Sequence, residues 1–591
     1  MPRIDEMPEY RAKLPKSVHD LSHKFGFTAT VAHLLPVFHD YLNAGETVEL
    51  GFNYNLRTQP LQSAAMVDIK SHVEYFFVPM QLLYEPFGSF LYGINDLYSS
   101  NFPVDVGTQV VQDTLPVLDF TTLNTEMQSW DSDTIIFEEW MNHAYRLMDH
   151  LGYNNTDLNQ ILGNTNHNPN VFPYPLLAYH CIYQYYYRLD NRERFNQSLF
   201  NWDQYYNTPL VTLSTTGYES LFQLHYRPKD SDYFTDIKVS PIVDVLNLNV
   251  KTSLAVANNW LSRENINDYS VIKQGAVGSV TNGNVSNSPD LFSSTPSGVI
   301  TTQFGMSALP YGNLGGVSDH NDVAINSQDI NTANIRAMFA SEKLWSITGR
   351  AKKHYDDQTL AHFGFEVPHD PKHEITCFGH DRGLIHIGEV ISTADTANAA
   401  LGEIAGKGYG QLQSQPHKFT APCHGVVMAI LSFVPDITYC NTYGKYNVMA
   451  SRADIYQPEY DHLGMQPLFG YEAEPDQYAG WTRIVGWQYR YEQWKRRYNR
   501  VSKAFGGNGS LDSWMLDFSA PSFNNQANSG NYTAFLHNPS ELNQIMLVNY
   551  KNASQIDETK SYDGDPFVID GFVHCKKVST MSDYSLPRLD A

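Results

Sequence analysis

The sequence predicts an all-β dominated protein, in which one β domain is interrupted by long, partly helical insertions. Three observations support this prediction. Short runs rich in β-branched and aromatic residues recur along the 591 residues, with Pro and Gly between them. Two long stretches interrupt this pattern. No segment repeats at a fixed period of about 20 to 50 residues, so the sequence does not favour a repeat architecture.

Four runs are predicted to be strands, at residues 47–56, 73–78, 426–434 and 570–578. The second run, VEYFFV, is rich in β-branched and aromatic residues. The third run, VVMAILSFV, is apolar on both of its alternating faces. That pattern is typical of a strand inside a packed sheet.

Helical periodicity occurs at three places, and the first two apolar stripes are interpreted as packing faces. The third helix is followed by Arg350, Lys352, Lys353 and His354, whose positive charge suits the negative end of a helix. The apolar positions are Ile136, Trp140, Ala144, Leu147 and Leu151; Tyr179, Ile182, Tyr183, Tyr186 and Leu189; and Ile335, Met338, Phe339 and Trp345.

Two insertions are predicted. Residues 101–170 form a partly helical insertion that carries the first helix, and residues 265–334 form a Gly/Ser/Asn-rich surface insertion with few charges and no periodicity. Loops this long are uncommon inside a compact domain and are usually functional or disordered. We therefore expect residues 1–591 to form one domain with insertions rather than several independent domains.

The composition suggests a surface made for protein contacts. Charged residues make up 17% of the chain, against about 25% in ordinary soluble domains, and aromatic residues make up 13%. Interface cores are depleted in charge and enriched in Tyr. The formal net charge of −23 makes the whole molecule repel nucleic acid, so any such contact must be local or mediated by a separate basic protein.

The five cysteines indicate neither a disulfide framework nor a zinc site, because they are scattered and form no CxxC pair. The first residues, MPRIDEMPEYRAKLPKS, lack the apolar core of an export signal, and no stretch approaches the roughly 18 apolar residues of a membrane span. Synthesis in a reducing cytoplasm without membrane insertion is expected. The cysteines are Cys181, Cys377, Cys423, Cys440 and Cys575.

The search for catalytic motifs is negative. The segment GEIAGKGYG at residues 402–410 fails the phosphate-loop pattern, since Gly408 stands where Ser or Thr should follow Lys407, and we predict a glycine-rich turn. His373 and Glu374 lack the second histidine of HExxH, and nearby prolines oppose a helix that would align His369 with His373. No GxSxG elbow occurs.

Acidic pairs are interpreted as solvated loops. They lie at residues 138–139, 356–357 and at Asp563 with Asp565, and for the last pair a calcium site is an alternative. No enzyme activity, cofactor or metal is predicted.

The strongest chemical cluster is WQYRYEQWKRRYNRVSK at residues 487–503. Basic groups that meet phosphates, interleaved with rings that stack on unpaired bases, are typical of single-strand binding. The alternative is a basic surface cluster that offsets an acidic chain, with its rings buried between subunits. The candidate nucleic-acid-binding residues are Arg490, Trp494, Lys495, Arg496, Arg497, Tyr498, Arg500 and Lys503.

An ordered series of segments resembles the major capsid proteins of the Microviridae, and is most similar to gokushovirus-like and Bacteroidetes-associated groups. The two predicted insertions depart from the family pattern. The matching segments include FFVPMQLLYEPF at residues 76–87, FPYPLLAYHCIYQYYYRLDNRE at 172–193, RAKKHYDDQTLAHFGFEVP at 350–368, IGEVIST at 387–393, HGVVMAILSFVPDITY at 424–439, DIYQPEYDHLGMQP at 454–467, GWQYRYEQWKRRYNRVSKAF at 486–505, SLDSWMLD at 510–517 and DPFVIDGF at 565–572.

The resemblance implies an eight-stranded antiparallel jelly roll, the viral capsid β-barrel, whose residues 265–334 protrude outward. It implies a bacteriophage virion protein that self-assembles, sixty copies to a T=1 icosahedral shell, around a circular single-stranded DNA genome. The implied partners are other copies of the chain, the packaged DNA, a small basic DNA-binding virion protein, a pilot protein and a host surface receptor.

Two other functions stay open. The aromatic content, the acidic charge and the paired carboxylates also suit a glycan-binding or glycan-cleaving β-sandwich protein. A spike or receptor-binding virion protein is the second alternative, because insertions on a shell subunit can also bind receptors.

Overall fold

The computed structural model describes residues 15–84, 87–92, 115, 118–119, 146–153, 170–189, 193, 223–239, 254–256, 323–325, 332–352, 354–391, 404–440, 442–452, 454–461, 464–473, 483–506, 509–518, 534–547 and 564–582. The chain forms two compact units. One comprises Met1–Pro241, Lys353–Leu360 and Gly364–Ala591, and the other comprises Ile242–Lys352 and Ala361–Phe363. Most of the two predicted insertions lies outside the described residues, so the one-domain division stays a prediction.

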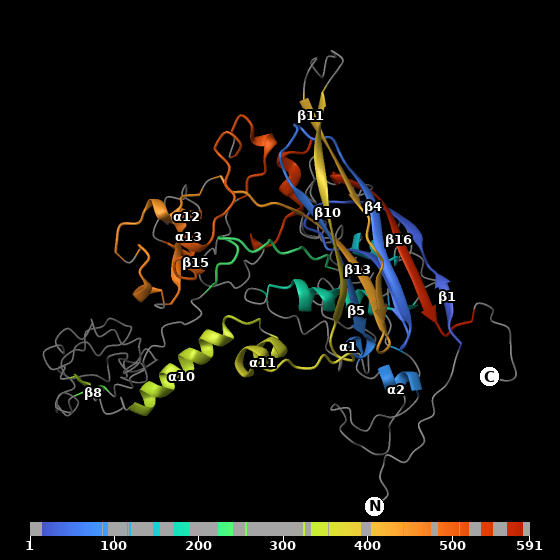
Figure 1. Ribbon diagram of the computed structural model, residues 1–591, viewed down its shortest axis with the longest axis horizontal. Helices are drawn as coiled ribbons and strands as arrows, with labels where there is room; N and C mark the ends of the chain where they lie inside the picture. Colours follow the sequence, from blue (N-terminus) through green and yellow to red (C-terminus); the bar gives the residue numbers. More distant parts are fainter. Residues whose placement is uncertain are drawn as a thin grey trace, which may run out of the picture. The chain divides into compact units, whose positions relative to one another are not determined.

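The first unit is built around a ten-stranded antiparallel sheet (Figure 1). Its main path runs β1-β16-β4-β11-β10-β5-β13-β3, while β2 also pairs with β16 and β12 with β4. The strands are β1 (Ser17–Asp20), β2 (His23–Ala29), β3 (Leu35–Leu42), β4 (Thr47–Thr58), β5 (Ile69–Pro79), β10 (Thr376–Ile391), β11 (Ile404–Leu412), β12 (His417–Thr420), β13 (Gly425–Pro435) and β16 (Phe567–Ser579).

The other described elements are three two-stranded sheets and a set of helices. Three two-stranded sheets join β6 (Leu118–Asp119) to β7 (Asn170–Val171), β8 (Leu254–Val256) to β9 (Val323–Ile325), and β14 (Gln466–Phe469) to β15 (Ile484–Gln488). The helices are α1 (Met80–Leu83), α2 (Phe87–Tyr92), α6 (Tyr174–Ile182), the π-helix η2 (Tyr183–Tyr187), α10 (Thr332–Thr348), α11 (Tyr355–Phe363), α12 (Gly470–Ala473), α13 (Glu492–Lys495), and the 3-10 turns η10 (Lys445–Asn447), η11 (Pro458–Tyr460), η12 (Asp512–Trp514) and η14 (Pro539–Gln544).

This topology confirms the predicted all-β fold class. The antiparallel sheet curls into a half-barrel, and its strands do not follow chain order: β5 lies between β10 and β13, and β4 lies between β16 and β11. Such interleaving of distant strands is consistent with a jelly roll, in which Greek-key connections cross from one side of the curled sheet to the other.

All four predicted strands are confirmed, within β4, β5, β13 and β16. Each of the eleven positions of β13 is buried, as its unbroken apolar run predicts. In contrast, β16 alternates buried and exposed positions over most of its length, so one face packs on the core and the other meets solvent. This alternation places polar and aromatic side chains on an open sheet face.

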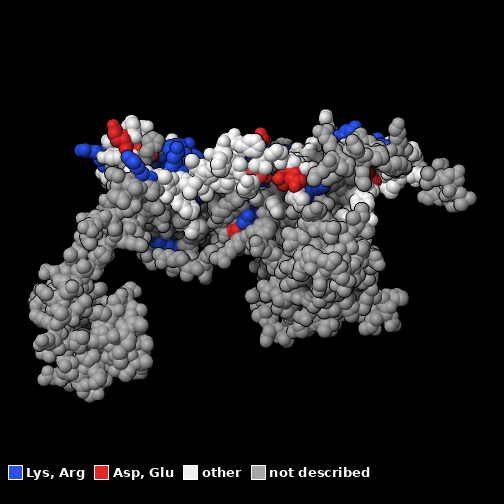
Figure 2. All heavy atoms as spheres, turned by 90° about the horizontal axis from the view of Figure 1, so that it is seen from below, with Lys and Arg blue, Asp and Glu red and all other residues white. Residues whose placement is uncertain are grey.

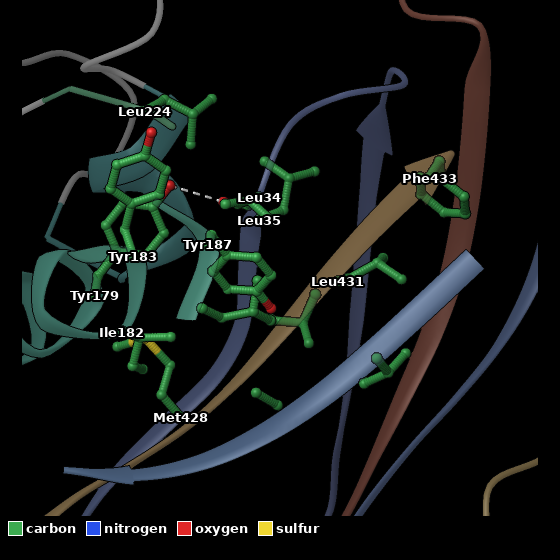
Figure 3. Close-up of a cluster of buried hydrophobic side chains, with 14 of the residues drawn as sticks. Leu34, Leu35, Tyr179, Ile182, Tyr183, Tyr187, Leu224, Met428, Leu431 and Phe433 are labelled. Atoms are coloured by element: carbon green, nitrogen blue, oxygen red, sulfur yellow. Dashed lines mark hydrogen bonds between the residues drawn. The ribbon is translucent and has the colours of Figure 1, made fainter. Parts of the chain in front are cut away.

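Helix α6 packs on β13, β5 and β3 and buries all nine of its residues (Figure 3). The Tyr179 hydroxyl donates to the Leu34 carbonyl oxygen at 3.0 Å, and accepts from the His225 backbone N–H at 3.0 Å. Because these polar groups are satisfied, the helix can lie in an apolar core.

The packing face predicted for this helix included Tyr186. This prediction is wrong, because Tyr186 is 46% exposed, whereas Tyr187 is buried. The cause is η2, since a π-helix takes more residues per turn and shifts the stripe by one position. For the predicted helix at 136–151, Leu147 and Leu151 are buried, and the part before residue 146 lies outside the described residues.

Helix α10 confirms the helix predicted from Ile335, Met338, Phe339 and Trp345, but several large apolar side chains of α10 and α11 face solvent. Phe339 and Trp345 of α10 are 59% and 55% exposed. Helix α11 has no buried residue, and it ends at Gly364, whose φ of 65° is the left-handed conformation that glycine readily adopts.

Candidate nucleic-acid and assembly surfaces

The basic and aromatic cluster at residues 487–503 begins on β15 and continues through α13. The Tyr491 backbone precedes α13 with a φ of 62°, and the Gln466 side chain accepts its N–H at 3.0 Å. After α13 the chain runs beside Tyr439, which donates to the Asn499 carbonyl and accepts from the Val501 N–H, both at 3.0 Å. The segment is therefore held by a hydrogen bond to a side chain before α13 and by main-chain hydrogen bonds after it.

Two of the aromatic rings in this cluster pack against other residues of the same subunit. Tyr491 is 1% exposed. The Tyr498 ring lies 4.8 Å from Phe234 and 5.6 Å from Tyr233, and burial raises the pKa of its hydroxyl. Trp494, by contrast, is 54% exposed. Among the candidate residues, Trp494 is the ring whose face meets solvent.

Several of the cations are also engaged. Arg496 donates to Asp236 through Nη1 and to Glu492 through Nε, both at 2.9 Å. Lys495 donates to the Arg490 carbonyl at 2.8 Å and lies 3.7 Å from Asp461. These contacts fix Arg496 and Lys495 on the surface of the subunit.

The other cations are more open. Arg497 lies over the Tyr446 ring at 4.7 Å, while Arg500 and Lys503 are exposed. None of these three forms an ion pair with a carboxylate of the described residues. Together with Trp494, they are the members of the cluster that remain available to a phosphate or a base.

A buried polar network lies beneath this cluster, and sequence analysis did not predict it. Glu472 is 1% exposed and accepts from the Tyr233 hydroxyl at 2.9 Å. Lys445 donates to the Pro467 carbonyl at 2.8 Å and lies 3.7 Å from Glu472. Burial raises the pKa of Glu472 and lowers that of Lys445. The residues of this network are far apart in the sequence, so no local motif predicts it.

A second, partly buried network links β5 and β10. His72 Nδ1 lies 3.1 Å from His380 Nε2, which is 3.8 Å from Glu74 Oε1. Arg227 donates to both Glu74 oxygens, at 3.0 and 3.2 Å, and the Tyr187 hydroxyl donates to the same carboxylate. Because the Arg227 cation already occupies Glu74, we interpret the cluster as structural rather than as a metal site.

The pKa values of this network follow from its burial. Burial and the Arg227 charge lower the pKa of His72 to about 3. Burial alone would raise the pKa of Glu74, but Arg227 and the hydrogen bonds donated to the carboxylate outweigh it and hold the pKa below the ordinary value. At neutral pH the network therefore contains a neutral His72 beside a Glu74–Arg227 ion pair.

The glycine-rich turn predicted at residues 402–410 is wrong, because residues 404–410 belong to strand β11. The glycines fit close neighbours: a Cβ on Gly406 would lie 2.2 Å from the Ser63 carbonyl oxygen, and one on Gly408 would lie 2.4 Å from Thr58 Cγ2. Lys407 and Tyr409, at the alternate positions of the strand, are exposed. The glycine pattern therefore reflects the alternation of buried and exposed positions along a strand, and not a turn.

Asp565 is not free to bind calcium, because Arg146 Nη2 donates to both of its oxygens at 2.9 Å and Thr28 donates at 2.7 Å. Asp563 lies outside the described residues. His373 lies on a turn and His369 lies on irregular backbone before it, so no helix aligns the two, as predicted. All five cysteines are free.

The exposed surface combines low charge with large apolar side chains. Figure 2 shows that the described atoms on one face are mostly neutral, with charged side chains in small groups. At the end of α11, Phe363 is 82% exposed and Phe365 is 58% exposed. Exposed apolar side chains of this size are candidates for contacts with other proteins.

The comparisons with known proteins agree along almost the whole chain. The family described as "Capsid protein (F protein)" matches residues 10–124 and 142–561. The "Capsid protein VP1" of Chlamydia phage 1 is 24% identical, over 99% of this chain and 97% of the relative. Among the described residues, no helix has the length and apolar character needed to cross a membrane.

These matches span both the sheet and the segments between its strands. They confirm the resemblance to the major capsid proteins of the Microviridae that the ordered segments predicted. Proteins of this family are structural parts of the virion and assemble into its shell. The chain belongs to the phage capsid protein (F protein) family.

Proposed function

We propose that this chain is the major capsid protein of a bacteriophage and self-assembles into a T=1 icosahedral shell around a circular single-stranded DNA genome. The observation that carries the proposal is the family match over residues 10–124 and 142–561, together with the curled antiparallel sheet. The exposed apolar side chains of α11 suit contacts with neighbouring copies. The role is structural, with no catalytic step.

The proposal includes a set of partners inside and outside the shell. The net charge of −23 opposes DNA, so a small basic DNA-binding virion protein neutralises most of the genome. Local contacts come from Trp494, Arg497, Arg500 and Lys503, which are exposed. A pilot protein and a host surface receptor complete the set, with residues 265–334 as the outward protrusion. Synthesis takes place in the cytoplasm of the bacterial host.

Negative-stain electron microscopy of the purified chain, or of particles that contain it, tests the shell. Uniform closed shells are the expected result. A chain that stays monomeric under conditions that assemble related shells would contradict the proposal. If that monomer bound and hydrolysed soluble oligosaccharides, the glycan-active β-sandwich protein would replace it.

A further inference from the structure

The solvent face of β2, β16, β4 and β11 carries a set of side chains that the sequence analysis did not connect. We propose that this face, defined by Lys24, Phe572, Asp570, Asn53, Asn55, Arg57, Gln411, Tyr409 and Lys407, binds single-stranded nucleic acid. The inference deepens the proposed function, because it assigns a surface of the subunit to the genome.

Strand pairing places these side chains in rows across the sheet. In one row Lys24 opposes Phe572, which opposes Asn53. In the next, Asp570 opposes Asn55, which opposes Gln411. In the third, Arg57 opposes Tyr409. Residues two apart on a strand share a face, so the three rows lie on one surface, about 7 Å apart.

The surface is open and hollowed. A groove of about 490 Å³ is lined by Lys24, Asn53, Asn55, Gln411, Asp570 and Phe572, among others. Tyr409 is 49% exposed and Phe572 is 39% exposed. The two rings are separated by two strand spacings and four residues along β4, which corresponds to about 17 Å. This spacing leaves room for more than one stacked base.

The charges suit a phosphate backbone. Lys24, Arg57 and Lys407 are exposed, and none forms an ion pair with a carboxylate in the part of the chain that the structure describes. Asp570 is the acidic member of the middle row. A carboxylate beside two carboxamides can meet the amino and carbonyl groups of base edges, while the flanking cations meet phosphates.

The chemistry differs from that of the cluster at residues 487–503. There, Tyr491 and Tyr498 pack inside the subunit and Arg496 is paired with two carboxylates. On the sheet face, both rings are exposed and the three cations are unpaired among the described residues. Exposed rings between free cations form the usual platform for unpaired bases.

Fluorescence polarisation of the full chain with a labelled single-stranded oligonucleotide of about 16 nucleotides tests the assignment. Replacing both rings (Tyr409→Ala with Phe572→Ala) should weaken binding at least tenfold. The double variant Arg57→Ala with Lys407→Ala should also weaken binding and make the slope of log affinity against log salt shallower by about 1.4. Thermal unfolding checks that each variant remains folded.

The matched control removes two other exposed cations, Lys343→Ala with Arg350→Ala on and just after α10, and should bind like the wild type. Wild-type binding by both test variants would overturn the inference, as would competition by a soluble oligosaccharide but not by unlabelled single strands. Microscopy separates the two proposals. If both test variants form intact shells and bind the oligonucleotide like the wild type, the nucleic-acid surface is contradicted and the capsid proposal stands. If the wild-type chain binds the oligonucleotide but forms no shell, the capsid proposal is contradicted instead.

Discussion

At the scale of single residues, the Glu74–Arg227 pair shows how the sheet accommodates charge. Both side chains are mostly buried, and the Ser432 and Tyr187 hydroxyls complete the network. Burying an ion pair costs free energy that the attraction between its partners only partly offsets, so the pair contributes little to stability as a unit. Removing one partner is different, because it leaves the other charge buried and alone.

We therefore predict that Arg227→Met destabilises the folded subunit by about 3 to 5 kcal/mol. Urea unfolding of the unassembled subunit measures the change. Lys70→Met is the matched control, since its ion pair with Asp436 is partly exposed and should contribute at most about 1 kcal/mol. Adding Glu74→Gln to Arg227→Met should recover part of the loss. Equal effects of the two single variants would contradict the prediction.

A second residue-scale prediction concerns pH. The pKa of His72 falls from 6.5 in an exposed imidazole to about 3 in the folded chain. Between these values the unfolded chain binds a proton that the folded chain does not, so stability decreases as pH falls from about 6.5 towards 3 and is fully present above that window. His72→Asn should lose less stability than the wild type over this range.

Urea unfolding midpoints at about pH 7, 5.5 and 4.5 provide the measurement. His386→Asn, an exposed position on β10, is the control and should follow the wild type. If His72→Asn retained the full pH dependence, the buried imidazole would not be its source.

Individual contacts were the part of the site that the sequence predicted least well. Residue type and spacing identified Arg496 and Tyr498 as candidates. They did not predict that Arg496 pairs with Asp236 or that the Tyr498 ring packs on Phe234, because both partners lie far away along the chain. Whether a ring is free to stack depends on such distant neighbours. The prediction for residues 487–503 therefore stays a prediction, now centred on Trp494, Arg497, Arg500 and Lys503.

At the scale of elements, β11 shows why glycine in a strand can be structural. The prediction is that Gly406→Ala destabilises the subunit by about 1 to 3 kcal/mol, because the new Cβ would collide with the Ser63 carbonyl. Gly388→Ala on β10 is the control, since its nearest atom would lie 3.9 Å away, and it should stay within about 0.5 kcal/mol of wild type. Comparable losses in both variants would indicate a general cost of alanine in these strands.

Elements with strong periodicity were predictable, and elements whose form depends on packing were not. The apolar run of β13 is rich in β-branched residues and forms a fully buried strand, as predicted. The glycines of β11 looked like a turn because the reason for them, the close approach of Ser63 and Thr58, is a tertiary contact. The π-helix η2 was not predictable from the sequence either. Its wider turn buries Tyr187 in place of Tyr186.

At the scale of the whole molecule, the exposed end of α11 makes assembly testable. Replacing Phe363 and Phe365 together by Ser should abolish shells while changing subunit stability by no more than about 0.5 kcal/mol, because both rings are exposed in the single chain. Sedimentation and electron microscopy measure assembly. The double replacement by Leu keeps the apolar area and should still form shells. Normal shells from the Ser variant would show that this surface is not a subunit contact.

The fold class was predictable because alternating and unbroken apolar runs each allow few strand environments, and because the family segments occur in order. The path of the sheet was not, since β16 pairs with β4 across nearly the whole chain and no local pattern records that distance. The face shared by β2, β16, β4 and β11 was missed for the same reason.

The position of β16 has a consequence for how the protein is made. This strand is the hydrogen-bonding neighbour of β1, β2 and β4, so those N-terminal strands have no partner on that side until the ribosome has reached β16, which begins at Phe567. Exposed strand edges in unfinished chains invite aggregation, which makes the interval before β16 arrives the vulnerable stage of synthesis.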